Sequence, residues 1–285
     1  MAWGFFKKLV IADRLALYVN DVYGAPANFN GLQLTLATVF FAYQIYCDFS
    51  GYSDIALGSA RILGFRMMTN FNDPYASGSI AEFWKRWHIS LSTWFRDYLY
   101  IPLGGNRVGK VRHQINLLVT FTVSGLWHGA NWTYILWGAL NGLYLMIGAL
   151  TTTIRDGFFD RIGLPRGTVI RGMLMVGTTF TLTCFAWILF RARNLEDAWY
   201  IFTHLHQGWD LGAISTPRFL LRQLPVAVMA IIVLEVIQWL NRRPEWVAQL
   251  PRVPTIVRWP AYATAVVAII LLGVFRDNQF IYFQF

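Results

Sequence analysis

Charged side chains are scarce in this chain of 285 residues. Asp, Glu, Lys and Arg make up 14% of it, against about 25% in ordinary soluble domains, whereas 56% of the residues are hydrophobic. This composition excludes a soluble globular domain and favours an integral membrane protein. The uninterrupted apolar runs favour helices over the alternating strands of a transmembrane barrel. The runs cover residues 32–58, 114–127, 131–152, 169–190, 224–241 and 259–275.

Cysteine is also scarce, and the chain shows no internal repeat, low-complexity segment or long polar linker. The two cysteines, Cys47 and Cys184, each lie inside an apolar run, which excludes a disulfide framework and gives no metal-ligand spacing. We therefore expect one membrane-embedded domain over residues 1–285. Its predicted fold class is all-α integral membrane, a polytopic helical bundle with short interfacial or re-entrant helices.

The net charge of +9 lies mainly at the ends of the apolar runs. This distribution follows the positive-inside rule, so we expect lipid as a partner and no nucleic acid. The rule places residues 61–112 in the cytoplasm, and residues 191–222 and the C-terminus outside. Residues 3–23 mix lysines with apolar residues and predict an interfacial or partly inserted helix.

Two histidines stand in tryptophan-rich segments and are the candidates for chemistry. His88 lies in FWKRWHISLSTWFRDYLYIPLGG (83–105) and His128 in SGLWHGANWTYILWG (124–138). Imidazole is well suited to taking a proton from a hydroxyl near neutral pH. The 14-residue run before His128 would span about 21 Å, less than the roughly 30 Å hydrocarbon core. We therefore expect His128 within the membrane, at the break made by GANW.

Each candidate also has a structural alternative. His128 is either a catalytic base or a packed histidine bonded to a helix carbonyl, and His88 either belongs to the site or ends an amphipathic anchor. Asn131 could orient the imidazole of His128 or donate to a carbonyl oxygen. For Asp48 and Asp54, inside an apolar run, we favour a structural role. Three cations, namely Lys85, Arg86 and Arg96, either attract an anionic acyl donor or contact lipid headgroups.

Four segments closely resemble the membrane-bound O-acyltransferase (MBOAT) family, nearest to its branch of alginate O-acetyltransferases. They are YQIYCDFSGYSDIALGSARILGF (43–65), NFNDPYASGSIAEFWKRWHISLSTWFRDYLYIPLGGNR (70–107), residues 124–138 and the ending FIYFQF (280–285). Family members usually have several further helices before the segment that opens this chain. The resemblance therefore implies a partial MBOAT fold, an N-terminally truncated chain that is the C-terminal part of a longer acyltransferase domain, and no activity for this part alone.

The resemblance also implies roles. It makes His128 the catalytic histidine and places His88 near the cytoplasmic mouth, where the donor arrives. In the tail, Tyr282 would carry the acyl group transiently. Where many relatives have a second histidine after the WHG motif, this chain has Asn141.

The resemblance predicts an O-acetyltransferase of the bacterial inner membrane. It would move acetyl groups from a cytoplasmic donor, acetyl-CoA or an acyl carrier protein, toward hydroxyls of an exported polysaccharide such as alginate. A periplasmic acetyltransferase partner is expected, and no metal or tightly bound cofactor. Two alternatives stay open: D-alanyl transfer to teichoic acid by related machinery, and a transporter or scaffold without catalysis.

Overall fold

A computed structural model describes residues 1–217, 219, 221–248 and 253–275. Every regular element in these ranges is helical, which confirms the all-α prediction. The chain forms two compact units, one made of Met1–Met67 with His204–Phe285 and the other of Met68–Thr203. Each is described below by itself, and the prediction of a single membrane domain stays a prediction.

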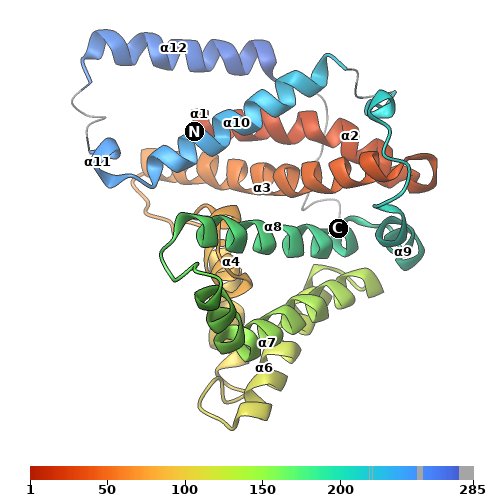
Figure 1. The fold of residues 1–285 in the computed structure, drawn as a ribbon. Coiled ribbons are helices and arrows are strands. Elements are labelled where there is room, and N and C mark those ends of the chain that lie inside the picture. Colours follow the sequence, from red (N-terminus) through yellow and green to blue (C-terminus); the bar gives the residue numbers. More distant parts are fainter. Residues whose placement is uncertain (218, 220, 249–252, 276–285) are drawn as a thin grey trace. The chain divides into compact units, whose positions relative to one another are not determined.

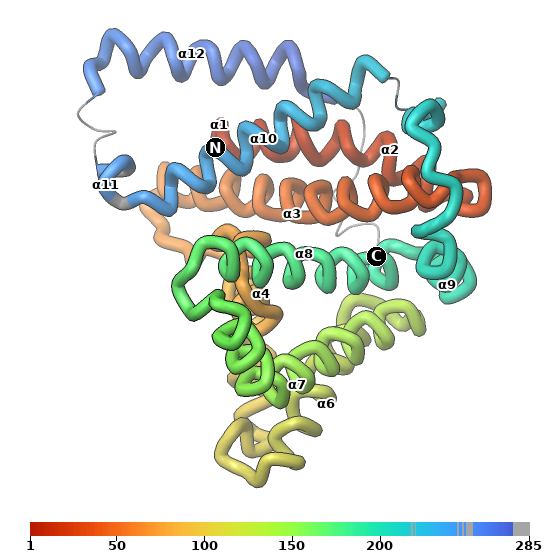
Figure 2. The backbone as a smooth tube through the Cα atoms, viewed as in Figure 1, coloured from red at the N-terminus to blue at the C-terminus, as the bar shows by residue number. Residues whose placement is uncertain are grey.

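The first unit is built along one long helix, α3 (Gly31–Ile62). Asn30 and Gln33 form a reciprocal capping box that starts this helix. A continuous helical segment packs along it, made of α1 (Ala2–Phe5), a π-helical stretch η1 (Phe6–Ala12) and α2 (Asp13–Gly24). Figures 1 and 2 show α2 and α3 lying side by side.

The segment at residues 3–23 is helical, and its predicted place, interfacial or partly inserted, stays a prediction. Val10, Ile11, Leu15 and Val19 are all 0% exposed, and so they belong to the core of the first unit. The expectation rested on the charges of this segment, which suggested a wet face. Its two lysines have carboxylate partners inside the unit.

Two lysines of η1 reach the carboxylates of neighbouring helices. Lys7 Nζ lies 2.9 Å from Asp54 Oδ2, and Lys8 Nζ lies 2.6 Å from Asp48 Oδ1 and 2.9 Å from Asp13 Oδ1. Buried charges are tolerated when they are paired in this way, because each carboxylate offsets the desolvation of its ammonium group. These contacts support the structural role predicted for Asp48 and Asp54.

The later helices of this unit are α10 (Gln223–Asn241), the short α11 (Pro244–Val247) and α12 (Thr255–Leu272). Tyr43 donates to Glu235 at 3.2 Å, and Gln238 donates to the Tyr46 hydroxyl at 2.6 Å. Helix α10 is thus joined to α3 by polar contacts.

The second unit centres on an antiparallel pair of helices, α6 (Lys110–His128) and α7 (Trp132–Arg161). Helix α8 (Val169–Arg191) packs against α7, and α9 (Leu195–His204) follows it. Helix α6 begins four residues before the apolar run that predicted it, because its first turn is polar. At 19 residues it is about 28 Å long rather than the predicted 21 Å.

The basic connection at residues 61–112 contains short helices, as predicted. They are η3 (Pro74–Ala76), α4 (Ile80–Arg86), α5 (Ile89–Phe95) and the π-helical η4 (Arg96–Tyr100). The sequence IPLGG after them forms turns, and GANW separates α6 from α7 as expected.

Four helices in the described ranges are long and apolar enough to cross a membrane: α7, α8, α10 and α12. Each of the six predicted apolar runs overlaps a helix. Helix α3 is long enough to span, but Asp48, Asp54 and other polar residues lower its mean hydropathy. The predicted helical membrane protein is confirmed, while its orientation stays a prediction.

Candidate active site

The site begins at a break between α4 and α5. Helix α4 starts at Ser79, whose hydroxyl accepts from the Glu82 amide at 3.1 Å, and it ends at Arg86. His88 then adopts a left-handed backbone conformation, with φ 42° and ψ 55°. For a residue other than glycine this conformation costs about 1–3 kcal/mol and needs support from its surroundings.

The loop at residues 70–72 supplies that support. The Asn70 carbonyl accepts from the Ile89 amide at 3.0 Å, and the Asn72 amide donates to the Arg86 carbonyl at 3.0 Å. These two bonds flank His88 on both sides. They hold the chain in its sharp bend and so fix the direction in which the imidazole leaves the backbone.

His128 is the last residue of α6, where the helix ends at Gly129. Its ring meets Trp127, Trp137 and Phe190 in edge-on contacts, with ring centroids 4.9, 5.2 and 5.2 Å away. Trp137 and Phe190 are almost fully buried. The imidazole is therefore held by aromatic walls that come from three helices.

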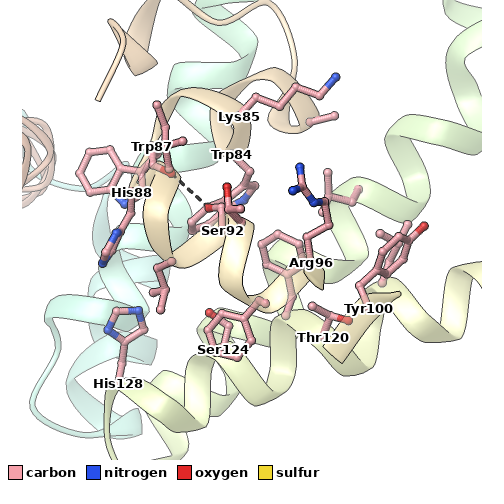
Figure 3. Close-up of a pocket in the computed structure, with 18 residues that line it drawn as sticks. Trp84, Lys85, Trp87, His88, Ser92, Arg96, Tyr100, Thr120, Ser124 and His128 are labelled. Carbon is pink, nitrogen blue, oxygen red and sulfur yellow. Dashed lines mark hydrogen bonds between the residues drawn. The ribbon is translucent and has the colours of Figure 1, made fainter. Parts of the chain in front are cut away.

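The two histidines line the same cavity, which has a volume of about 390 Å³ and lies wholly within the second unit. Figure 3 shows both imidazole rings at one end of the cavity, on the side away from Arg96 and Tyr100. Residues 40 positions apart in the sequence thus form one site.

Burial decides the charge state of His88, which lies outside the four candidate spans. Desolvation lowers the pKa of its imidazole from 6.5 to about 4. The ring is therefore neutral near pH 7. A neutral imidazole can accept a proton, which general-base chemistry requires.

The other predicted site residues fall in different places. Lys85 and Arg96 line the cavity, whereas Arg86 does not and pairs instead with Glu82 at 2.6 Å. Asn131 is the N-cap of α7, where its side chain accepts from the Thr133 amide at 3.1 Å. Tyr282 lies outside the described residues. The roles predicted for these residues stay predictions.

Several cavity residues were not predicted as members of the site. Four serine and threonine residues line the wall together with Trp84 and Tyr100, namely Ser92, Thr93, Thr120 and Ser124. On α6, Thr120 and Ser124 are four residues apart and share a face with His128, a spacing that could have indicated them.

Asn141 is buried and has a structural role in the wall of the cavity. It is buried within α7, where its side-chain amide donates to the Trp137 carbonyl at 2.8 Å and its oxygen accepts from the Trp84 indole at 3.3 Å. It therefore links α7 to α4 and fixes Trp84 on the cavity wall. The site combines neutral imidazole and hydroxyl groups with apolar walls and two cations, which suits the transfer of a group between an anionic carrier and an alcohol.

The described part of the second unit is helical, and its cavity is lined by two histidines. The chain belongs to the membrane-bound O-acyltransferase (MBOAT) family, whose model matches residues 4–187. It is a multi-pass protein of the bacterial inner membrane.

Three relatives illustrate the similarity. The chain is 42% identical to the "Probable alginate O-acetylase AlgI" of Pseudomonas aeruginosa, over 81% of this chain and 42% of the relative. It is 40% identical to the protein of the same name from Azotobacter vinelandii, over 82% and 45%. It is 39% identical to the peptidoglycan O-acetyltransferase of Helicobacter pylori, over 68% and 36%. The chain thus spans less than half the length of these relatives.

Proposed function

We propose that this chain forms the histidine-bearing part of an O-acetyltransferase that moves acetyl groups toward hydroxyls of an exported polysaccharide such as alginate. One observation carries the proposal: His88 and His128, which lie 40 positions apart, line a single cavity together with Lys85 and Arg96. The names of the relatives support the acetyl group and the polysaccharide.

His128 acts as the general base in this proposal. An acceptor hydroxyl attacks the thioester carbonyl of the donor, and the imidazole takes the hydroxyl proton as the new C–O bond forms. The C–S bond then breaks, and the thiolate leaves with that proton. The apolar walls around the ring exclude water, which would otherwise hydrolyse the reactive ester.

The donor is a substrate, acetyl-CoA or an acyl carrier protein, and it arrives from the cytoplasm. Both carriers bear phosphate, so Lys85 and Arg96 on the cavity wall favour their approach. Arg86 does not line the cavity, and its pairing with Glu82 offsets its charge. No tightly bound cofactor or metal takes part in the proposed transfer.

Two routes lead onward to the polymer. Tyr282 takes the acetyl group as a phenyl ester, whose phenol has a pKa near 10 and leaves more readily than a sugar alkoxide. Alternatively, a periplasmic acetyltransferase partner receives the group directly.

Tyr282→Phe separates the two routes, because it removes only the hydroxyl. Normal polymer acetylation by that variant would exclude the Tyr282 route and support direct transfer to the partner.

The central test is His128→Ala, expressed in cells that make the protein and the polymer. We expect the O-acetyl content of the secreted polymer to fall by at least about 100-fold, the usual contribution of a general base. The control is His206→Ala, which changes an exposed histidine in the other unit. Wild-type acetylation with His128→Ala, at equal protein abundance, would rule out the base assignment.

D-alanyl transfer to teichoic acid is the second candidate. Its support is the similarity to teichoic acid D-alanyltransferases of Streptococcus thermophilus and Bacillus subtilis, at 34% and 29% identity. These values lie below those of the alginate O-acetylases, so acetyl transfer is preferred. Radiolabelled acetyl and D-alanyl donors in native membranes would separate the two activities, and neither would be transferred by a mere transporter or scaffold.

A further inference from the structure

The imidazole of His88 has two nitrogens, and their roles depend on which of them carries the proton. In a neutral ring one nitrogen donates a hydrogen bond and the other accepts one. A histidine that presents N–H to a cavity can stabilise an oxyanion, whereas one that presents a lone pair can take a proton. The contacts behind the ring decide between these two possibilities.

Behind His88 lies Asn70, whose amide orientation is fixed by the main chain. The Ser90 backbone N–H points at one terminal atom of the Asn70 side chain, at 3.2 Å. An N–H can only donate, so this atom is the carbonyl oxygen Oδ1. The main-chain bond from the Ile89 amide to the Asn70 carbonyl holds the residue in this place.

The same Oδ1 atom orients the Ser90 hydroxyl, which lies 2.5 Å from it. Because Oδ1 accepts only, the single hydroxyl proton points toward Asn70. Ser90 Oγ therefore offers a lone pair to His88 Nδ1, which lies 3.4 Å away. Nδ1 is therefore the ring nitrogen with an acceptor behind it, and this acceptor favours a proton on Nδ1.

We infer that Asn70 and Ser90 hold His88 in the Nδ1–H tautomer, so that Nε2 is the basic nitrogen on the cavity side of the ring. Ser90 does not line the cavity and His88 does, which places Nδ1 on the outer side. His88 would then accept protons from hydroxyl, thiol or imidazolium groups and could not donate to a carbonyl oxygen. Asn70 and Ser90 are positioning residues, since they act through His88.

This inference deepens the proposed function and rests on it for its catalytic meaning. If the cavity binds an acetyl donor and an alcohol, His88 serves as a second proton acceptor beside His128. It does not serve as the group that stabilises the tetrahedral oxyanion. The tautomer itself is a property of the protein without substrate, and so it can be measured independently of transfer.

The experiment is nitrogen NMR of the full chain in lipid nanodiscs at pH 7.5, with ring-¹⁵N histidine. The His88 signal is assigned by its loss in His88→Asn, because asparagine tolerates the left-handed backbone. We expect the proton on Nδ1 in the wild-type protein. A proton on Nε2 would overturn the inference, and this measurement decides the tautomer even if a serine variant does not fold.

Substitutions then test the positioning residues. In Ser90→Ala we expect the ratio of Nδ1–H to Nε2–H forms to fall roughly threefold to tenfold, the worth of one neutral hydrogen bond. Ser90→Thr keeps the hydroxyl and should restore the wild-type ratio. The matched control is Ser92→Ala on the same helix, whose hydroxyl donates to the Trp87 carbonyl at 3.2 Å.

An unchanged ratio in Ser90→Ala would show that Ser90 does not set the tautomer. A shift of equal size in Ser92→Ala would show a general loosening of the helix and would likewise overturn the role of Ser90. If His128→Ala leaves polymer acetylation at the wild-type level while the Nδ1–H tautomer is observed, the proposed function fails and this inference stands.

Discussion

At the scale of single residues, the cavity divides three neighbouring cations into two kinds. Lys85 and Arg96 line it, although Arg96 also pairs with Asp97 at 2.7 Å, whereas Arg86 does not line it and pairs with Glu82. We therefore expect Lys85→Gln and Arg96→Gln each to raise the KM for an anionic acyl donor about twofold to fivefold, as loss of one solvent-exposed charge contact does.

The matched control for this prediction is Arg86→Gln, which removes an equal charge from the same helix as Lys85. It should change the KM less than either cavity substitution. Initial rates of acetyl transfer in native membranes, at low and at high salt, provide the measurement. Equal effects of all three variants would mean that the cations act only through the net charge of residues 61–112, and not through contacts in the cavity.

The lowered pKa of His88 also predicts how the local stability of the structure depends on pH. Its folded-state pKa is about 4 and its ordinary value is 6.5, so between these values the locally unfolded state binds more protons than the folded state. The local structure should therefore lose stability as the pH falls from about 6.5 to 4, and the change should be nearly absent above pH 7.

Amide hydrogen exchange at residues 88–92 measures this loss, after correction for the intrinsic pH dependence of exchange. His88→Asn is the matched control, because asparagine accepts the same backbone conformation and does not titrate in this range. If both proteins open equally at pH 5, then another group is responsible for the acid sensitivity of the break.

At the scale of elements, the glycines of α6 and α7 let the two helices that frame the site approach closely. A Cβ added at Gly138 would lie 2.2 Å from the Phe121 carbonyl oxygen, and one at Gly125 would lie 2.2 Å from that of Tyr134. Small residues at such crossings are typical of packed membrane helices. His128, at the end of α6, depends on this crossing for its position.

We predict that Gly138→Ala destabilises the protein by about 1–3 kcal/mol, the usual cost of overpacking a tight contact. The matched control is Gly148→Ala in the same helix, where an added Cβ would meet nothing within 4 Å. That control should be neutral or slightly stabilising, because alanine favours helix over glycine. Thermal unfolding in detergent compares the two variants, and equal melting temperatures would contradict the close crossing.

Much of this arrangement was predictable from the sequence, for identifiable reasons. Apolar runs and their breaks predicted α7, α8 and α10, the GANW break marked His128, and the tryptophan-rich segment marked His88, but the bend at His88 was not predicted. Residues 3–23 could be predicted as a helix, but the ion pairs of their lysines with α3 could not, because the partners lie 40 or more positions away. Asn70 and Ser90 lie 20 positions apart, and neither shows a pattern that would reveal their contact.

At the scale of the whole molecule, the direction of transfer depends on which membrane face each connection occupies. Charge counting predicts residues 61–112 in the cytoplasm and residues 191–222 outside. The cations beside the cavity belong to the first of these segments. A donor made in the cytoplasm can use Lys85 and Arg96 only if this orientation holds.

Single cysteines report the orientation directly. Cys47 and Cys184 are buried, at 0% and 8% exposure, so they add little background labelling. Asn106 and Leu211 are exposed, one in each segment. We expect a membrane-impermeant maleimide to label Leu211→Cys in intact cells, and Asn106→Cys only after the membrane is opened. Labelling of Asn106→Cys in intact cells would contradict this orientation, because it would place Lys85 and Arg96 on the outer side of the membrane. A thioester made in the cytoplasm could not reach these cations there. The acyl group would then have to enter the cavity at another point, on the cytoplasmic side of the membrane.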